Sequence, residues 1–523
     1  MKKTMWKRLG AIVAAVAMLL SIAACDGGND DKGGETYTDG KVFSEPTEIS
    51  IALSSHPTTP HKDDWIFWKY MQEATGAKLD ILAIPLDDFF TKVNLMMTSQ
   101  DTLPDLLHIT QKKMVDQSAN QGALMAFDDY EELLPDYKAF MESLPDNDRE
   151  EILAMRRTAD GKIYNAPAYG TQTVNNTRGW LYRKDIFEKY NLDVPTTYDE
   201  VYEVAKELKA LYPDSYPICF RHGFSQIRNM GAQWRPYHSF DIYYDFNEEV
   251  WKYGAFEDTT REMVAWLAKM VKEGLAPPNI VNISTKEWEE LLASDRGFIT
   301  LDYMVRIDHF NNLMASTNPT YEMAYMAPPA ANDLDLHKMC KVSVDLSGYA
   351  VCNTGDEKRI ENAFKLVNWM YTDEAAELLS WGKEGETFYV NDNGNRRFII
   401  EEEGATPNSL YGVAAFGLYQ RMKSDAFEAS YTEKQVAACR EAYQYLEEYI
   451  NPMWWLSFTD DESQTVTDID VALGTYCEEW IGKFIIGQEP LSKWDEFVEG
   501  GKKFKVDQMI SIYDAAYKRA IGK

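Results

Sequence analysis

Residues 48–53, EISIAL, begin the pattern that decides the fold. This run is a plausible β-strand. A polar loop, SSHPTTPHKDD, follows at 54–64, and the helical stretch WIFWKYMQEATG then occupies 65–76 and ends at Gly76. Glycine commonly terminates a helix. The order strand, loop, helix therefore predicts the first part of a βαβ unit.

The same order repeats directly downstream. KLDILAI at 78–84 alternates like a strand, DDFFTKVNLMMTS at 87–99 is helical in character, and PDLLHI at 104–109 reads as a third strand. Strands that alternate with helices of this length predict an α/β fold with a parallel sheet. In such sheets ligands bind beyond the carboxyl ends of the strands. Those ends are residues 54–64 and the loop that begins at Thr110.

Further elements are predicted along the rest of the chain. Residues 179–182 read as a strand, and the apolar runs GFITLDYM (297–304) and SGYAVC (347–352) as two more. Thr197 and Glu200 have the spacing of a capping box at the start of a long helix. The last quarter of the chain is helical and rich in aromatic residues.

The N-terminus has the features of an export signal. Four cations precede a run of 16 mostly apolar residues, Leu9 to Ala24, which is shorter than the roughly 20 needed to span a bilayer. The run ends in Ile22-Ala23-Ala24-Cys25, as in bacterial lipoprotein precursors, where such a cysteine is lipidated. We expect residues 1–24 to be a signal peptide, Cys25 the lipidation site and 25–43 a flexible tether. An ordinary signal peptide with an incidental cysteine is the alternative.

This interpretation places the protein on the extracellular face of the cell membrane, in contact with the membrane through the lipid alone. Removal of residues 1–24 leaves 49 basic and 84 acidic residues, a net charge of −35. Such acidity argues against a nucleic acid partner. Five cysteines remain besides Cys25, an odd number without a C-x-x-C pair, so we expect neither a disulfide scaffold nor a metal site.

Six motifs together resemble a known family. They are DGKIYNAP (160–167), YRKDIFEKYNLDVPTTYDEVYEVAKELKA (182–210), VKEGLAPP (271–278), LLSWGKEGETFY (378–389), KFIIGQEPLSKWDEFV (483–498) and IYDAAYKRA (512–520). Their order resembles that of the extracellular solute-binding lipoproteins of bacterial ABC importers, family 1. Within this family the chain is similar to the large oligosaccharide-binding subgroup that includes alginate-oligosaccharide binders.

The resemblance implies a two-lobed periplasmic-binding-protein-like fold of class II. Each lobe would be a central sheet flanked by helices, with the ligand in the cleft between them. We assign 44–167 with about 345–440 to lobe 1, and 168–344 with about 441–523 to lobe 2. The protein would be a monomeric binding protein, not an enzyme, and would need no cofactor. By an open–closed transition it would deliver an oligosaccharide to the transmembrane permease subunits. We expect a neutral sugar, because the acidic protein repels anions.

One departure from the subgroup concerns calcium. Where many members carry a calcium loop, this chain has KALYPDSYPI at 209–218, with Asp214 as the single carboxylate. Because Ca²⁺ takes six to eight oxygen ligands, we expect no calcium at this place. The stretch VNDNGNRRF at 390–398 lacks the closing glutamate of a calcium loop and is predicted to be an Asn-Gly hairpin turn.

Sugar receptors combine flat aromatic rings with charged or amide side chains. Trp381 and Glu384 lie in the family motif S-W-G-x-E-G and are candidates for ligand contacts. For Trp381, stacking on a ligand and packing in the core are equally plausible roles. Asp302 and Tyr303 follow an apolar strand and suit hydroxyl contacts. Arg306 is a third candidate there, although an ion pair with Asp302 or Asp308 is an alternative role.

Four further candidates come from loops. Trp234 lies in the loop-like stretch RNMGAQWRPYH, and Trp65 begins the first helix, where Trp68 is more suited to pack on the sheet. His56 and Asp64 belong to the loop before that helix. An acidic sugar remains an alternative to the neutral one. Arg221, Arg228 and Arg235 could form charge-assisted hydrogen bonds with the carboxylates of uronic acids.

Two other functions remain as alternatives. An extracellular glycoside hydrolase needs two carboxylates about 5–10 Å apart across the sugar. Pairs of acidic residues are frequent here, but they lie at predicted helix starts, where they favour the helix dipole. The motifs G-x-S-x-G, H-E-x-x-H and G-x-x-x-x-G-K-[ST] do not occur in the sequence. A peptide binder or a ligand sensor on the same fold stays open.

Overall fold

The computed structural model describes residues 41–55, 59–170, 178–331, 335–341, 347–402, 405–413 and 418–522. All of them belong to the unit Thr36–Lys523. The predicted signal peptide, Cys25 and His56 lie outside the described residues. Within the described part of the chain, no helix is both long enough and apolar enough to cross a membrane.

The first sheet contains the strands predicted from the opening pattern. Its order is β2-β1-β3-β9, with β1 at Thr47–Ser55, β2 at Ala77–Pro85, β3 at Leu106–Ile109 and β9 at Gly348–Val351. β1 pairs in parallel with both β2 and β3, whereas β9 runs antiparallel to β3. The predicted βαβ units and their parallel sheet are confirmed. Helix α1 (Ile66–Thr75) ends at Gly76, whose φ of 78° suits glycine at a helix end.

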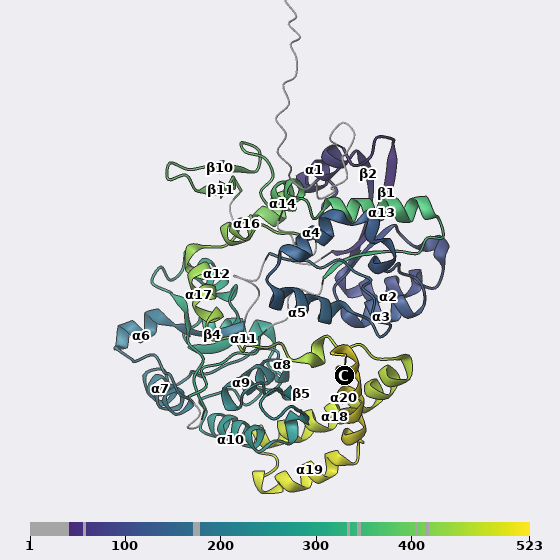
Figure 1. The fold of residues 1–523 in the computed structure, drawn as a ribbon. Helices are drawn as coiled ribbons and strands as arrows, with labels where there is room; N and C mark the ends of the chain where they lie inside the picture. Colours follow the sequence, from purple (N-terminus) through teal and green to yellow (C-terminus); the bar gives the residue numbers. More distant parts are fainter. Residues whose placement is uncertain are drawn as a thin grey trace, which may run out of the picture. The chain divides into compact units, whose positions relative to one another are not determined.

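Both faces of this sheet are covered by helices (Figure 1). Ile49, Ile51 and Leu53 of β1 share a core with α1 and α13 (Glu357–Trp369). Ala52 faces the opposite core, which α2 (Leu86–Met96) and α3 (Lys112–Asn120) complete. Consecutive residues Ile51, Ala52 and Leu53 are therefore buried on the two faces of the sheet in turn, as expected for a mainly parallel sheet.

The second sheet has three antiparallel strands in the order β7-β4-β8. The central strand β4 (Arg178–Arg183) pairs with β7 (Ile299–Tyr303) on one side and β8 (Met323–Met326) on the other. Adjacent residues of β4 enter different cores, since Trp180 packs in one hydrophobic cluster and Leu181 in another. The predicted strands at 179–182, 297–304 and 347–352 are confirmed as β4, β7 and β9.

Helices make up most of the remaining structure. Between β3 and β8 they are η3 (Phe127–Leu133), α4 (Pro135–Ser143), α5 (Asp146–Arg156), α6 (Lys184–Tyr190), α7 (Tyr198–Leu211), α8 (Phe224–Ile227), η4 (Arg228–Met230), α9 (Gly231–Trp234), η5 (Gly254–Phe256), α10 (Asp258–Lys272), α11 (Thr285–Ala293) and α12 (Arg306–Met314). The short turn η2 (Gln100–Thr102) precedes β3, and β5 (Ile242–Asp245) pairs with β6 (Val250–Tyr253).

The later part of the chain adds helices to both sheets. They are α14 (Asp373–Ser380), α15 (Pro407–Tyr411), α16 (Ser424–Ala429), α17 (Glu433–Tyr443), η7 (Pro452–Trp454), α18 (Asp460–Ile485), η8 (Leu491–Lys493), α19 (Trp494–Lys502) and α20 (Val506–Ala520). α14 packs on α1, α17 packs on α12 and β8, and α18 packs on α10 and α20. The yellow helices α18, α19 and α20 lie close to α10 in Figure 1. The exact lobe boundaries stay a prediction.

Two local predictions are confirmed. Thr197 and Glu200 form a capping box at the start of α7, in which each side chain binds the other residue's backbone N–H. β10 (Phe388–Val390) and β11 (Arg396–Phe398) form an antiparallel hairpin. Its turn is closed by the Asn391 N–H, which donates to the Asn395 carbonyl at 2.9 Å. Gly394 adopts a φ of 77° in this turn, a value that favours glycine.

The burial of β4 predicts a strong dependence on Trp180. This side chain is fully buried, whereas Trp454 is 57% exposed. Trp180→Ala is expected to lower the free energy of unfolding by about 3–5 kcal/mol, because it leaves a cavity in the core. Trp454→Ala is expected to change it by about 0.5 kcal/mol or less. Chemical denaturation of both variants tests this, and equal losses would contradict the assignment of Trp180 to the core.

Candidate functional site

The carboxyl ends of β1 and β3 border a cavity of about 270 Å³. Its lining combines strand ends with the loop before α1: Leu53, Ser54, Ser55, Thr59, His61, Trp65, Leu86, Thr110, Gln111 and Leu418. The sequence places ligand contacts at the ends of these same two strands. The cavity offers hydroxyl, amide and aromatic groups, which are the groups that bind sugars.

Trp65 is held firmly beside this cavity. Its side chain is 4% exposed, and its Nε1–H donates to the Ser409 carbonyl at 3.3 Å. Gly412 lies against one face of the indole so closely that a Cβ would approach the ring to 2.8 Å. His61 contacts the same ring edge-on and accepts a hydrogen bond at 2.9 Å from Trp68 Nε1–H. Asp64, in the same loop, is exposed.

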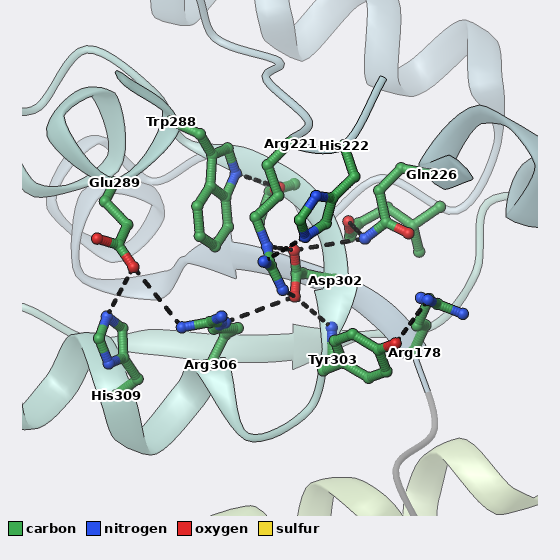
Figure 2. Close-up of polar contacts among 12 residues, drawn as sticks. Arg178, Arg221, His222, Gln226, Trp288, Glu289, Asp302, Tyr303, Arg306 and His309 are labelled. Carbon is green, nitrogen blue, oxygen red and sulfur yellow. Dashed lines mark hydrogen bonds and ion pairs between the residues drawn. The ribbon is translucent and has the colours of Figure 1, made fainter. Parts of the chain in front are cut away.

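The second group of polar residues lies at the end of β7 (Figure 2). Asp302 is fully buried and forms a two-point ion pair with Arg221, in which Nη2 donates to Oδ1 at 2.8 Å and Nε to Oδ2. The Tyr303 backbone N–H donates to the same carboxylate at 2.7 Å, and Gln226 Nε2 adds a bond at 3.4 Å. A buried carboxylate requires such pairing, because its desolvation is costly.

The loop that carries Arg221 has an unusual backbone. His222 has a φ of 61°, and Gly223 follows with a φ of 45°. A Cβ at Gly223 would lie 1.9 Å from the Val281 carbonyl oxygen, so only glycine fits there. The His222 ring contacts the Arg221 guanidinium through Nε2. Burial first, and then the neighbouring Arg221 charge, lower the pKa of His222.

Arg306 lies on the other side of Asp302, at the start of α12. Its Nε is 3.6 Å from Asp302 Oδ1, and its Nη1 is 3.6 Å from Glu289 Oε1. His309 Nε2 lies 3.2 Å from the same Glu289 oxygen. The Trp288 ring lies beside both guanidiniums, 5.1 Å from that of Arg221 and 5.6 Å from that of Arg306.

Arg178 completes the group at the first residue of β4, where it pairs in register with Tyr303. Its Nη2 donates to the Tyr303 hydroxyl at 2.7 Å, and its guanidinium carbon is 4.3 Å from the centroid of that ring. Its Nε is buried without a hydrogen-bond partner. No carboxylate of a described residue lies within 4 Å of Arg178, in contrast to Arg221 and Arg306.

Arg178 also borders a cavity of about 330 Å³. The other lining residues come from α8, η4, the segment 237–241, the segment 339–341 and the stretch 447–454: Ser225, Arg228, Asn229, Tyr237, Ser239, Asp241, Met339, Cys340, Lys341, Glu447, Asn451 and Trp454. Trp454 is the most exposed aromatic residue among them. Asn451 Nδ2 is buried and without a partner.

Glu447 is the buried carboxyl group of this cavity, with 8% of its surface exposed. Burial raises its pKa to about 8, although the Tyr237 backbone N–H donates to it and favours the charged form. Asp241 is the second carboxyl group of the cavity. Burial raises its pKa to about 6, although the charge of Arg228 opposes this shift. The carboxyl groups of the cavity therefore carry less negative charge near neutral pH than their number indicates.

The structure brings together three of the predicted site residues, Asp302, Tyr303 and Arg306. Trp65 lies at the cavity of the first sheet. Trp381 is 1% exposed, with its faces stacked by Phe398 and Arg396, and its Nε1–H donates to Asp425 at 3.2 Å. These contacts favour the packing role.

The contacts described for Trp234 and Glu384 are with residues outside the Asp302 group. Trp234 is 5% exposed and packs on Tyr198 within the core. Glu384 is exposed and forms a bridge with Phe388 near the hairpin. The roles of both residues in ligand binding remain predictions.

Sequence reasoning did not find Arg178, His61, Glu447 or Trp454. Arg178 lies at the amino end of the predicted strand at 179–182, so a rule for the carboxyl ends of strands does not find it; its antiparallel pairing with Tyr303 brings it to this group. Nothing local distinguishes Trp454 from its neighbour Trp455. Among the described residues, no group of three or more His, Cys, Asp or Glu side chains is placed to hold a metal ion.

The two sheets, each covered by helices, and the polar groups at their strand ends define a two-lobed α/β solute-binding protein. A family model of bacterial extracellular solute-binding proteins matches residues 61–377, which is more than half of the chain. The protein belongs to this family.

Curated relatives and solved structures agree with this assignment. The chain is 20% identical to the lipoprotein LipO of Bacillus subtilis (strain 168), over 99% of both chains. It is 22% identical to a carbohydrate ABC transporter substrate-binding protein of Streptococcus pneumoniae serotype 4 (strain ATCC BAA-334 / TIGR4), over 76% of both. The crystal structure of the alginate-binding protein AlgQ2 without calcium ion is similar, with a TM-score of 0.69, 22% identity and coverage of 92% of this chain and 99% of that one.

The raised pKa of Glu447 predicts a pH dependence of stability. In the unfolded chain this group titrates near 4.5, and in the folded protein near 8, so the folded state holds the extra proton between these values. Its contribution is complete below pH 4.5 and is lost as pH rises to 8. Over this range we expect a loss of roughly 3–5 kcal/mol, at about 1.4 kcal/mol per pKa unit.

Glu447→Gln mimics the protonated form and is expected to remove this loss. Denaturation measured at pH 5, 6.5 and 8 for the wild type and the variant tests it. Exposed Glu448→Gln serves as the control. Parallel pH profiles for wild type and Glu447→Gln would contradict the neutral state of the buried carboxyl.

Proposed function

We propose that the protein is the substrate-binding component of a bacterial ABC importer and that it binds an oligosaccharide. The observation that carries the proposal is the family match over residues 61–377. A carbohydrate ABC transporter relative and an alginate-binding neighbour support a sugar as the solute. The strand ends of both sheets supply aromatic rings and polar side chains, the two kinds of group that a sugar requires.

Function would follow from a change between open and closed states. A ligand closes such a protein only if it binds the closed state more tightly than the open one. Polar groups at the ends of both sheets, such as Thr110 in one and Tyr303 in the other, would each hold part of the sugar. The closed form would then be the one recognised by the permease subunits. In this role the protein acts as a monomeric binding protein and carries out no reaction.

The hydrolase alternative has less support. Asp87 and Asp88 lie in the first turn of α2, and Asp460, Asp461 and Glu462 in the first turn of α18. Acidic residues at these positions stabilise the helix dipole and need no catalytic explanation. The relatives are binding proteins by their names, which favours binding over turnover.

A ligand screen tests the proposal directly. Neutral and acidic oligosaccharides and short peptides are compared by thermal shift and then by calorimetry. At a ligand concentration 100 times Kd, binding is expected to raise the free energy of unfolding by about 2.7 kcal/mol. We expect a sugar to give this shift and to remain uncleaved, as shown by unchanged reducing ends. A response to peptides alone, or the appearance of new reducing ends, would overturn the proposal.

A lipid anchor at Cys25 would hold the protein at the extracellular face of the membrane. The Ile22-Ala23-Ala24-Cys25 sequence and the lipoprotein relative support this anchor. Cys25→Ser is expected to release the protein into the medium or to leave it unprocessed, because the substituted residue cannot accept the lipid. Membrane fractionation and the mass of the mature N-terminus measure the outcome. A variant that stays membrane-bound and is cleaved normally would contradict the anchor.

A further inference from the structure

We propose that the cavity beside Arg178 binds the carboxylate of an acidic sugar, so that the ligand is an oligosaccharide containing uronic acid. This inference rests on the proposed function and specifies its ligand. It replaces the expectation of a neutral sugar, which was based on the net charge of the whole chain. The charges that face the cavity support the opposite choice.

Arg178 is the cation of the cavity that no carboxylate of a described residue contacts. Its one side-chain hydrogen bond among the described residues goes to the neutral hydroxyl of Tyr303, at 2.7 Å. Its Nε is buried without a hydrogen-bond partner, as is the Nε of Arg228. A guanidinium can donate five hydrogen bonds and matches a carboxylate through two parallel ones. Arg178 therefore lacks the partner that a ligand carboxylate would supply.

The other cations of the cavity already have partners. Arg228 pairs with Asp241 at 3.4 Å and with Glu478 at 2.9 Å. Lys341 lies 3.1 Å from Glu151 and donates to the Glu448 carbonyl at 3.2 Å. Arg228 and Lys341 thus each have a carboxylate within 4 Å, and none of these carboxylates contacts Arg178.

The carboxyl groups of the cavity do not neutralise Arg178 either. Asp241 is paired with Arg228. Burial raises the pKa of Glu447 to about 8, so this carboxyl group is mostly protonated at neutral pH. A charged Glu447 would repel an anionic ligand, but the neutral acid can donate a hydrogen bond to it. Arg178 therefore keeps a positive charge without a carboxylate partner at the cavity, although the whole protein is strongly acidic.

The neighbouring group around Asp302 does not neutralise Arg178 either. Arg221, Arg306 and Arg178 contribute three guanidiniums, against the carboxylates of Asp302 and Glu289. Burial, followed by the adjacent arginines, lowers the pKa of both His222 and His309, so neither ring adds a cation at neutral pH. One positive charge remains in excess, and it belongs to Arg178, the arginine at the cavity.

The cavity also suits the ring of a sugar. Trp454 lines it with an indole that is 57% exposed, which leaves a flat surface for the C–H face of a sugar. Ser225 and Asn229 supply hydroxyl and amide groups at the same lining, and Asn451 has a buried amide nitrogen without a partner. A uronate combines the groups that fit these features, namely hydroxyls, an apolar face and a carboxylate.

The experiment uses two probes of the same skeleton, tri-galacturonate and its fully methyl-esterified form. The ester keeps the hydroxyls and removes the negative charge. We expect wild-type protein to bind the uronate at least about 10-fold more tightly by calorimetry, since hydrogen bonds to charged groups are the stronger ones. Oligomers of mannuronate and guluronate extend the comparison to other uronates, and neutral oligosaccharides complete the panel.

Arg178→Gln is expected to weaken uronate binding by about 10- to 100-fold and to abolish the preference over the ester. Arg178→Lys keeps the charge without the two-point geometry and should lie between the wild type and Arg178→Gln. Arg261→Gln removes one charge from an exposed position of α10 and should bind like the wild type. An unchanged apo Tm in each variant shows that the fold is intact.

The outcomes separate the two proposals. Tight binding of neutral oligosaccharides without any binding of uronates would overturn the acidic ligand and leave the sugar-binding function in place. Uronate binding that is unaffected by Arg178→Gln would overturn the assignment to this cavity. If no oligosaccharide binds at all, the proposed function fails together with this inference.

Discussion

The buried ion pair between Arg221 and Asp302 is the interaction on which the arrangement of the Arg178 group depends. Asp302 is fully buried and Arg221 is 5% exposed, so either charge alone would carry a large desolvation cost. The pair is stable because Gln226 and the Tyr303 backbone donate to the same carboxylate. It fixes the loop after Cys219 to the end of β7 and with it the positions of His222 and Tyr303.

The loop turns directly after the residue that pairs with Asp302. His222 and Gly223, which follow Arg221, both have positive φ angles. Gly223 then lies directly against the Val281 carbonyl. Because Tyr303 is held by its own backbone N–H, its hydroxyl is in place to accept from Arg178. Arg178 is thus placed by the pairing of β4 with β7 and by the Tyr303 hydroxyl.

Much of the fold followed from the sequence because the signals were local. The strand-like run at 48–53, the capping box at Thr197 and the Asn-Gly turn before Asn395 are each decided by neighbours in the chain. The strand-end rule also located Asp302 and Tyr303, since it needs only the end of an apolar run. The resemblance to a family extended these local results to the whole chain.

The exposure of aromatic side chains could not be predicted from local sequence patterns. Trp381 is covered by Phe398 and Arg396, which come from a hairpin that begins several residues later. Trp454 and Trp455 are adjacent, yet one is 57% exposed and the other 8%. Which of two neighbours faces solvent depends on long-range packing. The sequence therefore identified candidate tryptophans but could not distinguish those that stack on a ligand from those that pack in the core.

The same distinction between local and global properties applies to charge. At physiological ionic strength, charges more than about 8 Å apart in water are largely screened. The −35 charge of the mature chain therefore acts on the approach of a ligand, whereas Arg178 and Glu447 act on a ligand that is already bound. Burial of Glu447 removes a negative charge from the cavity and leaves Arg178 as the unpaired cation. A carboxylate bound to Arg178 would in turn favour the neutral form of Glu447, because two negative charges in one cavity repel each other. Ligand binding and protonation of Glu447 would then be linked, and each would strengthen the other by the same factor.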